Sequence, residues 1–155
     1  MSCERFRAVA TVVVGVAFAV AIGAMAFSRE TAPKPAKIGK ADAAGAIFER
    51  ADTLRTEHEN GNTTLDVTTL LSSDGRFGSG MYRSGKVREV IDAPYGVDEF
   101  MYFLEGGVRL TSADGTVQVI SAGEAVTIPK EWTGLWETDG YTKIWVIYSD
   151  DGSGL

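Results

Sequence analysis

The segment YGVDEFMYFLEGG, residues 95–107, carries the strongest strand signal in the chain and ends on a pair of glycines. Side chains alternate along a strand, so the segment has two faces. One face carries Glu99, Met101 and Phe103, and the other carries Phe100, Tyr102 and Leu104. A strand with only one face on a core would alternate apolar with polar residues. We therefore expect the N-terminal segment or a second subunit to cover the second face.

Short strand-like segments follow one another from Thr64 onward, about every ten residues and with no helical period between them. Residues 65–71 and 86–91 alternate, residues 72–80 form a turn-rich loop, and Asp114-Gly115 predicts a hairpin. Residues 121–129 and 132–149 supply three more strands. Gly106, Gly115 and Gly123 are interpreted as turn glycines. This spacing predicts an all-β sandwich or barrel.

An uncharged apolar run, Ala8 to Phe27, lies near the N-terminus and follows Arg5 and Arg7. As a helix it would span about 30 Å, the thickness of one hydrocarbon core. The basic flank predicts an inner- or plasma-membrane anchor with the rest of the chain exported, into the periplasm in a Gram-negative host. In the alternative, a signal peptide is cleaved after Ala26 and releases a secreted or periplasmic domain.

The sequence divides into four parts: an anchor or signal peptide at 1–27, a linker at 28–62, a domain at 63–150 and a flexible tail at 151–155. Within the linker, residues 41–55 predict a short amphipathic helix with Ile47, Phe48 and Leu54 on one side. His58 lies in a polar turn, where we expect it to be solvated. Cys3 is the only cysteine, which excludes an intramolecular disulfide.

The chain is acidic, with a net charge of −6, which argues against nucleic acid as a partner. Its apolar content of 45% is sufficient for a packed core.

The spacing of residues in two segments resembles that of a known protein family. Glu99 and Gly106 are separated by six residues, and Gly123 and Pro129 by five. Both spacings occur in the two signature motifs of the cupin superfamily, which this chain resembles. The segments DEFMYFLEG, SADGT, AGEAVTIPKEWTGLWE and YTKIWVIY, within residues 78–148, further resemble the ureidoglycine aminohydrolase-type cupin domain. The resemblance implies a double-sheet jelly-roll barrel.

The resemblance also implies a metal held by histidines just before Glu99 and in the second motif. In this sequence residues 92–95 read DAPY, and Gly134 stands at the second-motif histidine position. Transition metals in such sites depend on imidazole nitrogen. We therefore predict no bound metal or other cofactor, and we do not expect ureidoglycine aminohydrolase activity.

The same alignment leaves a small-molecule site at the barrel mouth, lined by Met101, Phe103 and Trp136 around the Glu99 carboxylate. Tyr82 and Lys143 are further candidate ligand contacts. A carboxylate that points into a barrel requires a partner because its desolvation is costly. That partner is either a ligand or a cation, and the candidate cations are Lys143, Arg83 and Arg88.

Three functions remain open at this point. The first is a metal-independent module that binds a small molecule or serves a structural role. The second is a metal-independent enzyme, of isomerase, lyase or hydrolase type, that uses Glu99 as its general acid or base. The third is an interaction module that forms a homodimer through the doubly apolar strand. The sequence does not specify the ligand.

Overall fold

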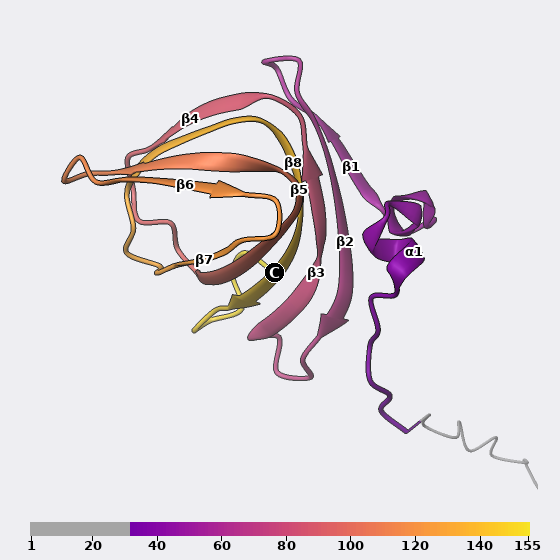
Figure 1. The fold of residues 1–155 in the computed structure, drawn as a ribbon. Helices are drawn as coiled ribbons and strands as arrows, with labels where there is room; N and C mark the ends of the chain where they lie inside the picture. The colour runs from indigo at the N-terminus through magenta and orange to yellow at the C-terminus, as the bar shows by residue number, and fades with distance from the viewer. Residues whose placement is uncertain (1–31) are drawn as a thin grey trace, which may run out of the picture. The chain divides into compact units, whose positions relative to one another are not determined.

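The computed structural model describes residues 32–155, and residues 34–155 form one compact unit. Eight strands make a single sheet that curls around an enclosed interior (Figure 1). The strands are β1 (Leu54–Glu57), β2 (Thr63–Leu71), β3 (Phe77–Ser84), β4 (Val87–Ile91), β5 (Asp98–Ser112), β6 (Val117–Ser121), β7 (Ala125–Ile128) and β8 (Gly134–Tyr148). The prediction of an all-β fold is confirmed.

The predicted membrane segment, Ala8 to Phe27, and the cleavage site after Ala26 lie outside the described residues, as does Cys3. Among residues 32–155, no helix has both the length and the apolar character needed to cross a membrane.

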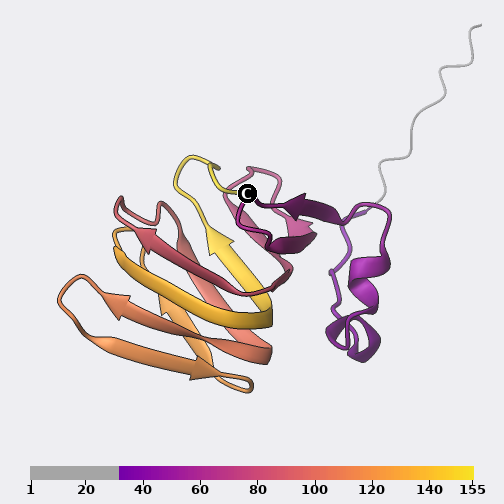
Figure 2. The same cartoon turned by 90° about the horizontal axis from the view of Figure 1, so that it is seen from above.

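Two long strands, β5 and β8, organise the sheet. They pair with each other from Asp98 opposite Tyr148 to Ser112 opposite Gly134. The strand order is β1-β2-β3-β8-β5-β6, with β4 added along β8 and β7 along β5. One half of the β5–β8 pair is therefore flanked by β3 and β7, and the other half by β4 and β6. Both walls of the barrel share this pair (Figures 1 and 2).

Glycine allows β5 and β8 to bend where they pass from one wall to the other. Gly106 has a φ of 67°, and a Cβ there would lie 2.0 Å from the carbonyl oxygen of Gly140. The register of the β5–β8 pairing shifts on both sides of this point. Gly106 was predicted as a turn, but the strand continues through it, because the bulged backbone remains paired. For the same reason, residues 134–148 form one strand rather than two.

The segment before β1 contains fewer helical residues than predicted. It contains α1 (Lys40–Ala43) and a 3-10 turn, η1 (Ala46–Glu49), which are separated by Gly45 at a φ of 110°. Leu54 belongs to β1 and is exposed, so the predicted helix over 41–55 is wrong beyond residue 49. Ile47 is buried against β2 and β3 and packs in one cluster with Leu104 of β5.

The N-terminal segment therefore covers only part of the second face of β5. Phe100 and Tyr102, on the same face as Leu104, remain 42% and 37% exposed.

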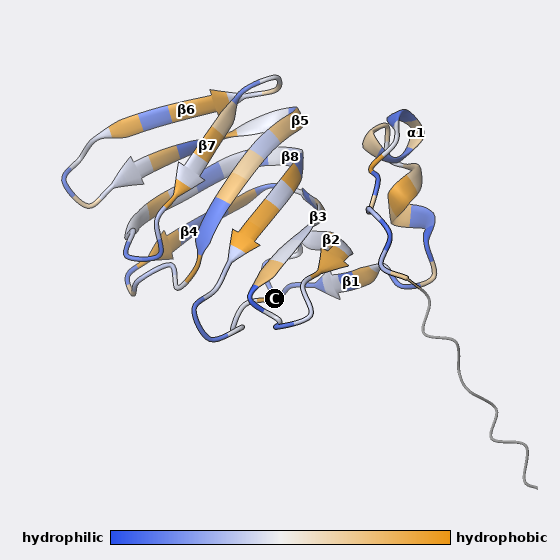
Figure 3. Ribbon diagram, turned by 90° about the horizontal axis from the view of Figure 1, so that it is seen from below, coloured by the Kyte–Doolittle hydropathy of each residue, from blue (hydrophilic) through white to orange (hydrophobic). Residues whose placement is uncertain are grey.

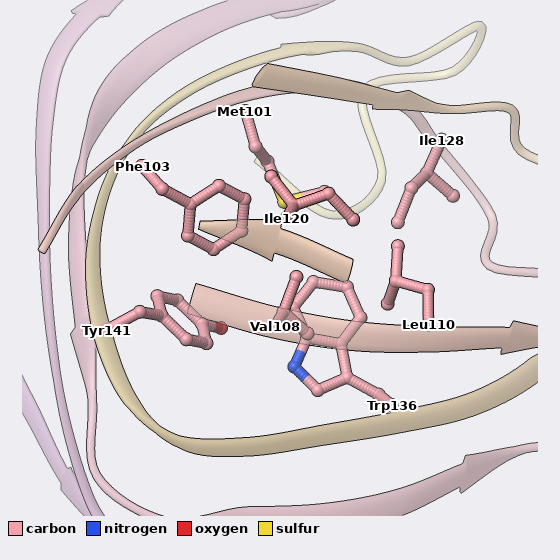
Figure 4. Close-up of a cluster of buried hydrophobic side chains, with 8 residues drawn as sticks. All are labelled: Met101, Phe103, Val108, Leu110, Ile120, Ile128, Trp136 and Tyr141. Carbon is pink, nitrogen blue, oxygen red and sulfur yellow. The ribbon is translucent and has the colours of Figure 1, made fainter. Parts of the chain in front are cut away.

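The main core lies inside the curl of the sheet, and its side chains come from β5, β6, β7 and β8 (Figure 4). It consists of Met101, Phe103, Val108, Leu110, Ile120, Ile128, Trp136 and Tyr141. Along β5 from residue 98 to 103, buried residues alternate with more exposed ones, as predicted for Glu99, Met101 and Phe103. Hydropathy changes repeatedly along the strands, as expected when side chains alternate between interior and solvent (Figure 3).

Candidate functional site

A cavity of about 540 Å³ opens into the barrel next to this core. Its walls come mainly from β2, β3, β4 and β8, and β5 contributes Glu99. The aromatic lining residues are Tyr82, Tyr95, Trp136, Tyr141 and Trp145, and the inward-facing charged ones are Asp66, Glu89, Glu99 and Lys143. The interior of the barrel is therefore not filled by apolar side chains alone.

A buried ion pair lines this cavity. Glu99 and Lys143 are 3% and 5% exposed, and the Lys143 Nζ lies 2.6 Å from the Glu99 Oε1. The ammonium also contacts the Met101 sulfur at 3.0 Å. Lys143 is thus the cation that sequence reasoning sought for Glu99. The other two candidates bind elsewhere: Arg83 lies near Glu105, and Arg88 pairs with Glu137.

Three aromatic rings surround the Lys143 ammonium. Its Nζ lies 5.5 Å from the ring centroid of Tyr82, 5.6 Å from that of Trp136 and 5.9 Å from that of Tyr141. The negative face of an aromatic ring attracts a cation at such distances, and more strongly where water is excluded. A carboxylate, a thioether and three rings therefore compensate the lost hydration of the ammonium.

Tyr95 holds the second oxygen of Glu99. Its hydroxyl donates a hydrogen bond to Oε2, and its ring stacks on Trp136 with centroids 6.4 Å apart. The backbone N–H of Tyr95 donates to the Trp132 carbonyl at 3.0 Å, which fixes the loop before β5. Burial, reinforced by the charge of Glu99, raises the pKa of Tyr95 far above its usual value. The phenol therefore stays protonated and remains a donor.

Asp66 and Glu89 bring negative charge to the cavity from two different strands, β2 and β4. Asp66 accepts a hydrogen bond from the Trp145 indole N–H at 3.1 Å. Burial raises the pKa of Asp66, and the Trp145 bond partly offsets this effect. Trp145 reaches Asp66 across Gly80, where a Cβ would lie 2.6 Å from the indole ring. Only glycine at position 80 leaves room for this ring.

The Tyr141 hydroxyl is a polar group without a protein partner. Tyr141 is only 7% exposed and lines the cavity, and its hydroxyl forms no hydrogen bond within residues 32–155. Figure 4 shows the ring extending into the interior of the barrel. Burial raises the pKa of Tyr141 well above its usual value, with the nearby Tyr82 and carboxylates adding to this effect. The group is thus a neutral phenol that faces the cavity.

The structure brings together four of the six residues predicted to bind a ligand: Glu99, Tyr82, Trp136 and Lys143 all line the cavity. The other two, Met101 and Phe103, are fully buried in the core and do not line it. His58, expected to be solvated, is exposed, but it lies at the cavity edge with its Nε2 3.0 Å from the Thr64 hydroxyl.

Sequence reasoning missed Tyr95, Tyr141, Trp145, Asp66 and Glu89 as cavity residues. Alternation along β8 carried a usable signal, because Tyr141, Lys143 and Trp145 share one face of that strand. Once Lys143 is assigned to the inner face of β8, Tyr141 and Trp145 are expected on that face as well.

The residues present do not fit a metal ion of the kind that the cupin resemblance implies. The positions expected to hold histidines carry residues 92–95, DAPY, and Gly134. The Glu99 carboxylate is bound by an ammonium, which would repel a metal cation. Within the described part of the chain, no three His, Cys, Asp or Glu side chains come together in a way that could hold a metal.

The single curled sheet is an all-β, cupin-like fold. Residues 84–143 match the model of the EutQ-like cupin domain, which supports a cupin domain in this part of the chain.

Solved structures extend this comparison. The chain is similar to a protein of unknown function from Rhizobium leguminosarum, at 23% identity over 76% of this chain and 99% of that one, with a TM-score of 0.52. Ectoine synthase from P. lautus is 16% identical over 66% and 72% of the two chains, with a TM-score of 0.52. The EutQ protein of Clostridium difficile is 22% identical over 65% and 79%, with a TM-score of 0.49. Likeness at this level of identity concerns the fold alone.

A search among curated proteins found no match to this sequence.

Replacing Lys143 by methionine should strongly destabilise the protein. The variant leaves the Glu99 carboxylate buried without a cation, and breaking a buried pair in this way typically costs about 3–5 kcal/mol. Urea unfolding of the full-length protein measures the loss. The control is Lys86→Met, which removes an exposed ion pair with Asp139 and should change stability little. Adding Glu99→Gln to Lys143→Met should restore part of the loss. Similar stabilities for the two single lysine variants would contradict this account of the pair.

Proposed function

We propose that this cupin-domain protein binds a small organic molecule in its barrel cavity and does so without a metal. The observation that carries the proposal is the cavity itself, whose volume of about 540 Å³ lies within the roughly 300–1,000 Å³ common for ligand pockets. Aromatic side chains supply apolar contact area, and a few fixed polar groups supply orientation, which is the usual composition of such sites.

The cost of the charged interior supports binding over a purely structural role. Burying Glu99 and Lys143 removes two charges from water, and an apolar pair of similar size is often as stable or more stable. A barrel with only a structural role has no need for this pair. In the proposed site, the polar groups of Glu99, Lys143 and Tyr95 are held in place by one another and orient the ligand.

The contacts of Glu99 favour binding over acid–base catalysis by this residue. Its Oε1 accepts from Lys143 and its Oε2 from Tyr95, so each oxygen already has one donor that fixes it in place. A proton transfer at Glu99 would have to compete with these two contacts for the carboxylate.

Filling the cavity should abolish ligand binding without unfolding the protein. Thr68 of β2 and Ile91 of β4 both line the cavity. The indole side chain of Thr68→Trp or of Ile91→Trp would occupy the volume of the cavity. Ligand-detected NMR with a library of small polar fragments measures binding to the full-length protein. We expect fragments that bind the wild type to lose their signal with both variants.

The matched control for this experiment is Thr116→Trp, the same exchange at an exposed position outside the cavity, which should retain the binding fragments. Circular dichroism verifies the fold of each variant. Fragments that bind the two cavity-filling variants as well as the wild type would contradict the proposal, as would a library with no binding fragment.

A second proposal concerns the outer face of the sheet, which we infer to be covered by a second copy of the chain. Phe77, Phe100 and Tyr148 are 40%, 42% and 46% exposed. Phe77 pairs with Tyr148, and Phe100 pairs with Val146, which lies two residues before Tyr148 on β8. All four side chains therefore lie on one face of the sheet. An exposed apolar patch of this kind is typical of a protein interface.

Replacing Phe100 by aspartate should therefore convert a dimer into a monomer, because it buries a charge in the apolar interface. Light scattering by the full-length protein gives its mass. Val119→Asp, at an exposed apolar position on β6 away from this face, is the control and should leave the dimer intact. A monomeric wild type, or a dimer that survives Phe100→Asp, would refute the proposal.

A further inference from the structure

The charges that face the cavity do not balance. Glu99 is neutralised by Lys143 at 2.6 Å. Asp66 and Glu89 form no ion pair with any residue in the described range 32–155. Arg88 also borders the cavity, but its Nε lies 3.1 Å from the Glu137 carboxylate, on the opposite side of β4 from Glu89. The cavity therefore has two carboxylates without an ion-pair partner in this range: Asp66, which is half-buried and feels the charge of Lys143 without pairing with it, and Glu89, which is exposed.

The aromatic side chains that line the cavity also favour a positively charged ligand. Tyr82 lies next to Asp66 in the sheet, and Trp136 lies next to Glu89. Each of these two carboxylates thus has an aromatic neighbour that lines the cavity. Ring faces attract cations and give little attraction to anions. The rings already surround one ammonium, that of Lys143, at 5.5–5.9 Å, which shows that this interior accommodates a cation.

The Tyr141 hydroxyl is an independent sign of a ligand. It belongs to a side chain more than nine-tenths buried, faces the cavity, and forms no hydrogen bond within the described part of the chain. No fully buried side-chain nitrogen or oxygen in this range lacks a partner, so the Tyr141 hydroxyl is accessible from the cavity, where water or a ligand atom can bond to it. A ligand that carries an N–H or a polar oxygen would supply the missing partner, because a phenol both donates and accepts.

We propose that the cavity binds a small organic cation, a protonated amine, whose ammonium group lies between Asp66 and Glu89. Its body packs against Tyr82 and Trp136, and a polar atom of the ligand bonds to the Tyr141 hydroxyl. The inference rests on the proposed function, since it concerns the same cavity and names the class of molecule that enters it. A bare metal ion is disfavoured, because the described residues offer no group of three ligands of the usual kind.

Three four-carbon probes test the charge preference: butylammonium, butyrate and butanol. The readout is the indole N–H signal of Trp145 and of Trp136 in proton–nitrogen NMR spectra of the full-length protein at low ionic strength. Trp145 is a direct reporter, because its indole N–H is bonded to Asp66. We expect saturable shifts with butylammonium and no saturable shifts with butyrate or butanol.

Two variants then test where the charge of the ligand lies. Asp66→Asn and Glu89→Gln should each weaken butylammonium binding about fivefold, the effect of removing one nearby charge at a partly solvated site. Glu131→Gln removes one negative charge at an exposed position that does not line the cavity, and should leave the affinity unchanged. An unchanged affinity in both cavity variants overturns the proposal.

The probes also separate this proposal from the proposed function on which it rests. Saturable binding of butyrate or butanol at least as tight as that of butylammonium overturns the cation class, but leaves the cavity as a binding site. If no probe shifts either indole signal, the cation proposal fails, and the fragment screen with the cavity-filling variants then decides separately whether the cavity binds any ligand.

Discussion

The ion pair between Glu99 and Lys143 is the interaction on which the interior of this barrel depends. Two buried charges are tolerable only when every lost contact with water is replaced. Here the replacements come from the Tyr95 hydroxyl, the Met101 sulfur and three aromatic rings. These groups belong to β3, β5, β8 and the loop before β5, so a single ion pair connects much of the barrel.

The same pair shapes what the cavity can bind. The Lys143 ammonium bound to Glu99 would repel a metal cation beside that carboxylate, and the pair adds no net charge to the cavity. Among residues 32–155, the cavity carboxylates without an ion-pair partner are Asp66 and Glu89, and the Tyr141 hydroxyl forms no hydrogen bond to the protein. In the proposed binding mode, charge and aromatic contact take the place of metal coordination, and that difference defines the proposed class of ligand.

Alternation and spacing predicted the strands, the inward face of β5 and a short list of cations for Glu99 that included the correct one. They could not predict that Gly106 and Gly140 allow β5 and β8 to run on as single bent strands, because the same residue type also ends strands. Nor could they predict the cavity position of Asp66, which depends on pairing across β2, β3 and β8. Met101 and Phe103 face inward as predicted, but whether an inward residue lines a cavity or fills the core depends on its position along the barrel.

The most direct test of this account observes the Lys143 ammonium itself. Nitrogen-15 NMR of lysine side chains in the full-length protein should show one ammonium group whose protons exchange slowly with water, because it is buried and hydrogen-bonded. That signal should disappear in Lys143→Met and shift in Glu99→Gln, while the signals of exposed lysines stay unchanged. A Lys143 ammonium whose protons exchange with water as fast as those of the exposed lysines would contradict the account.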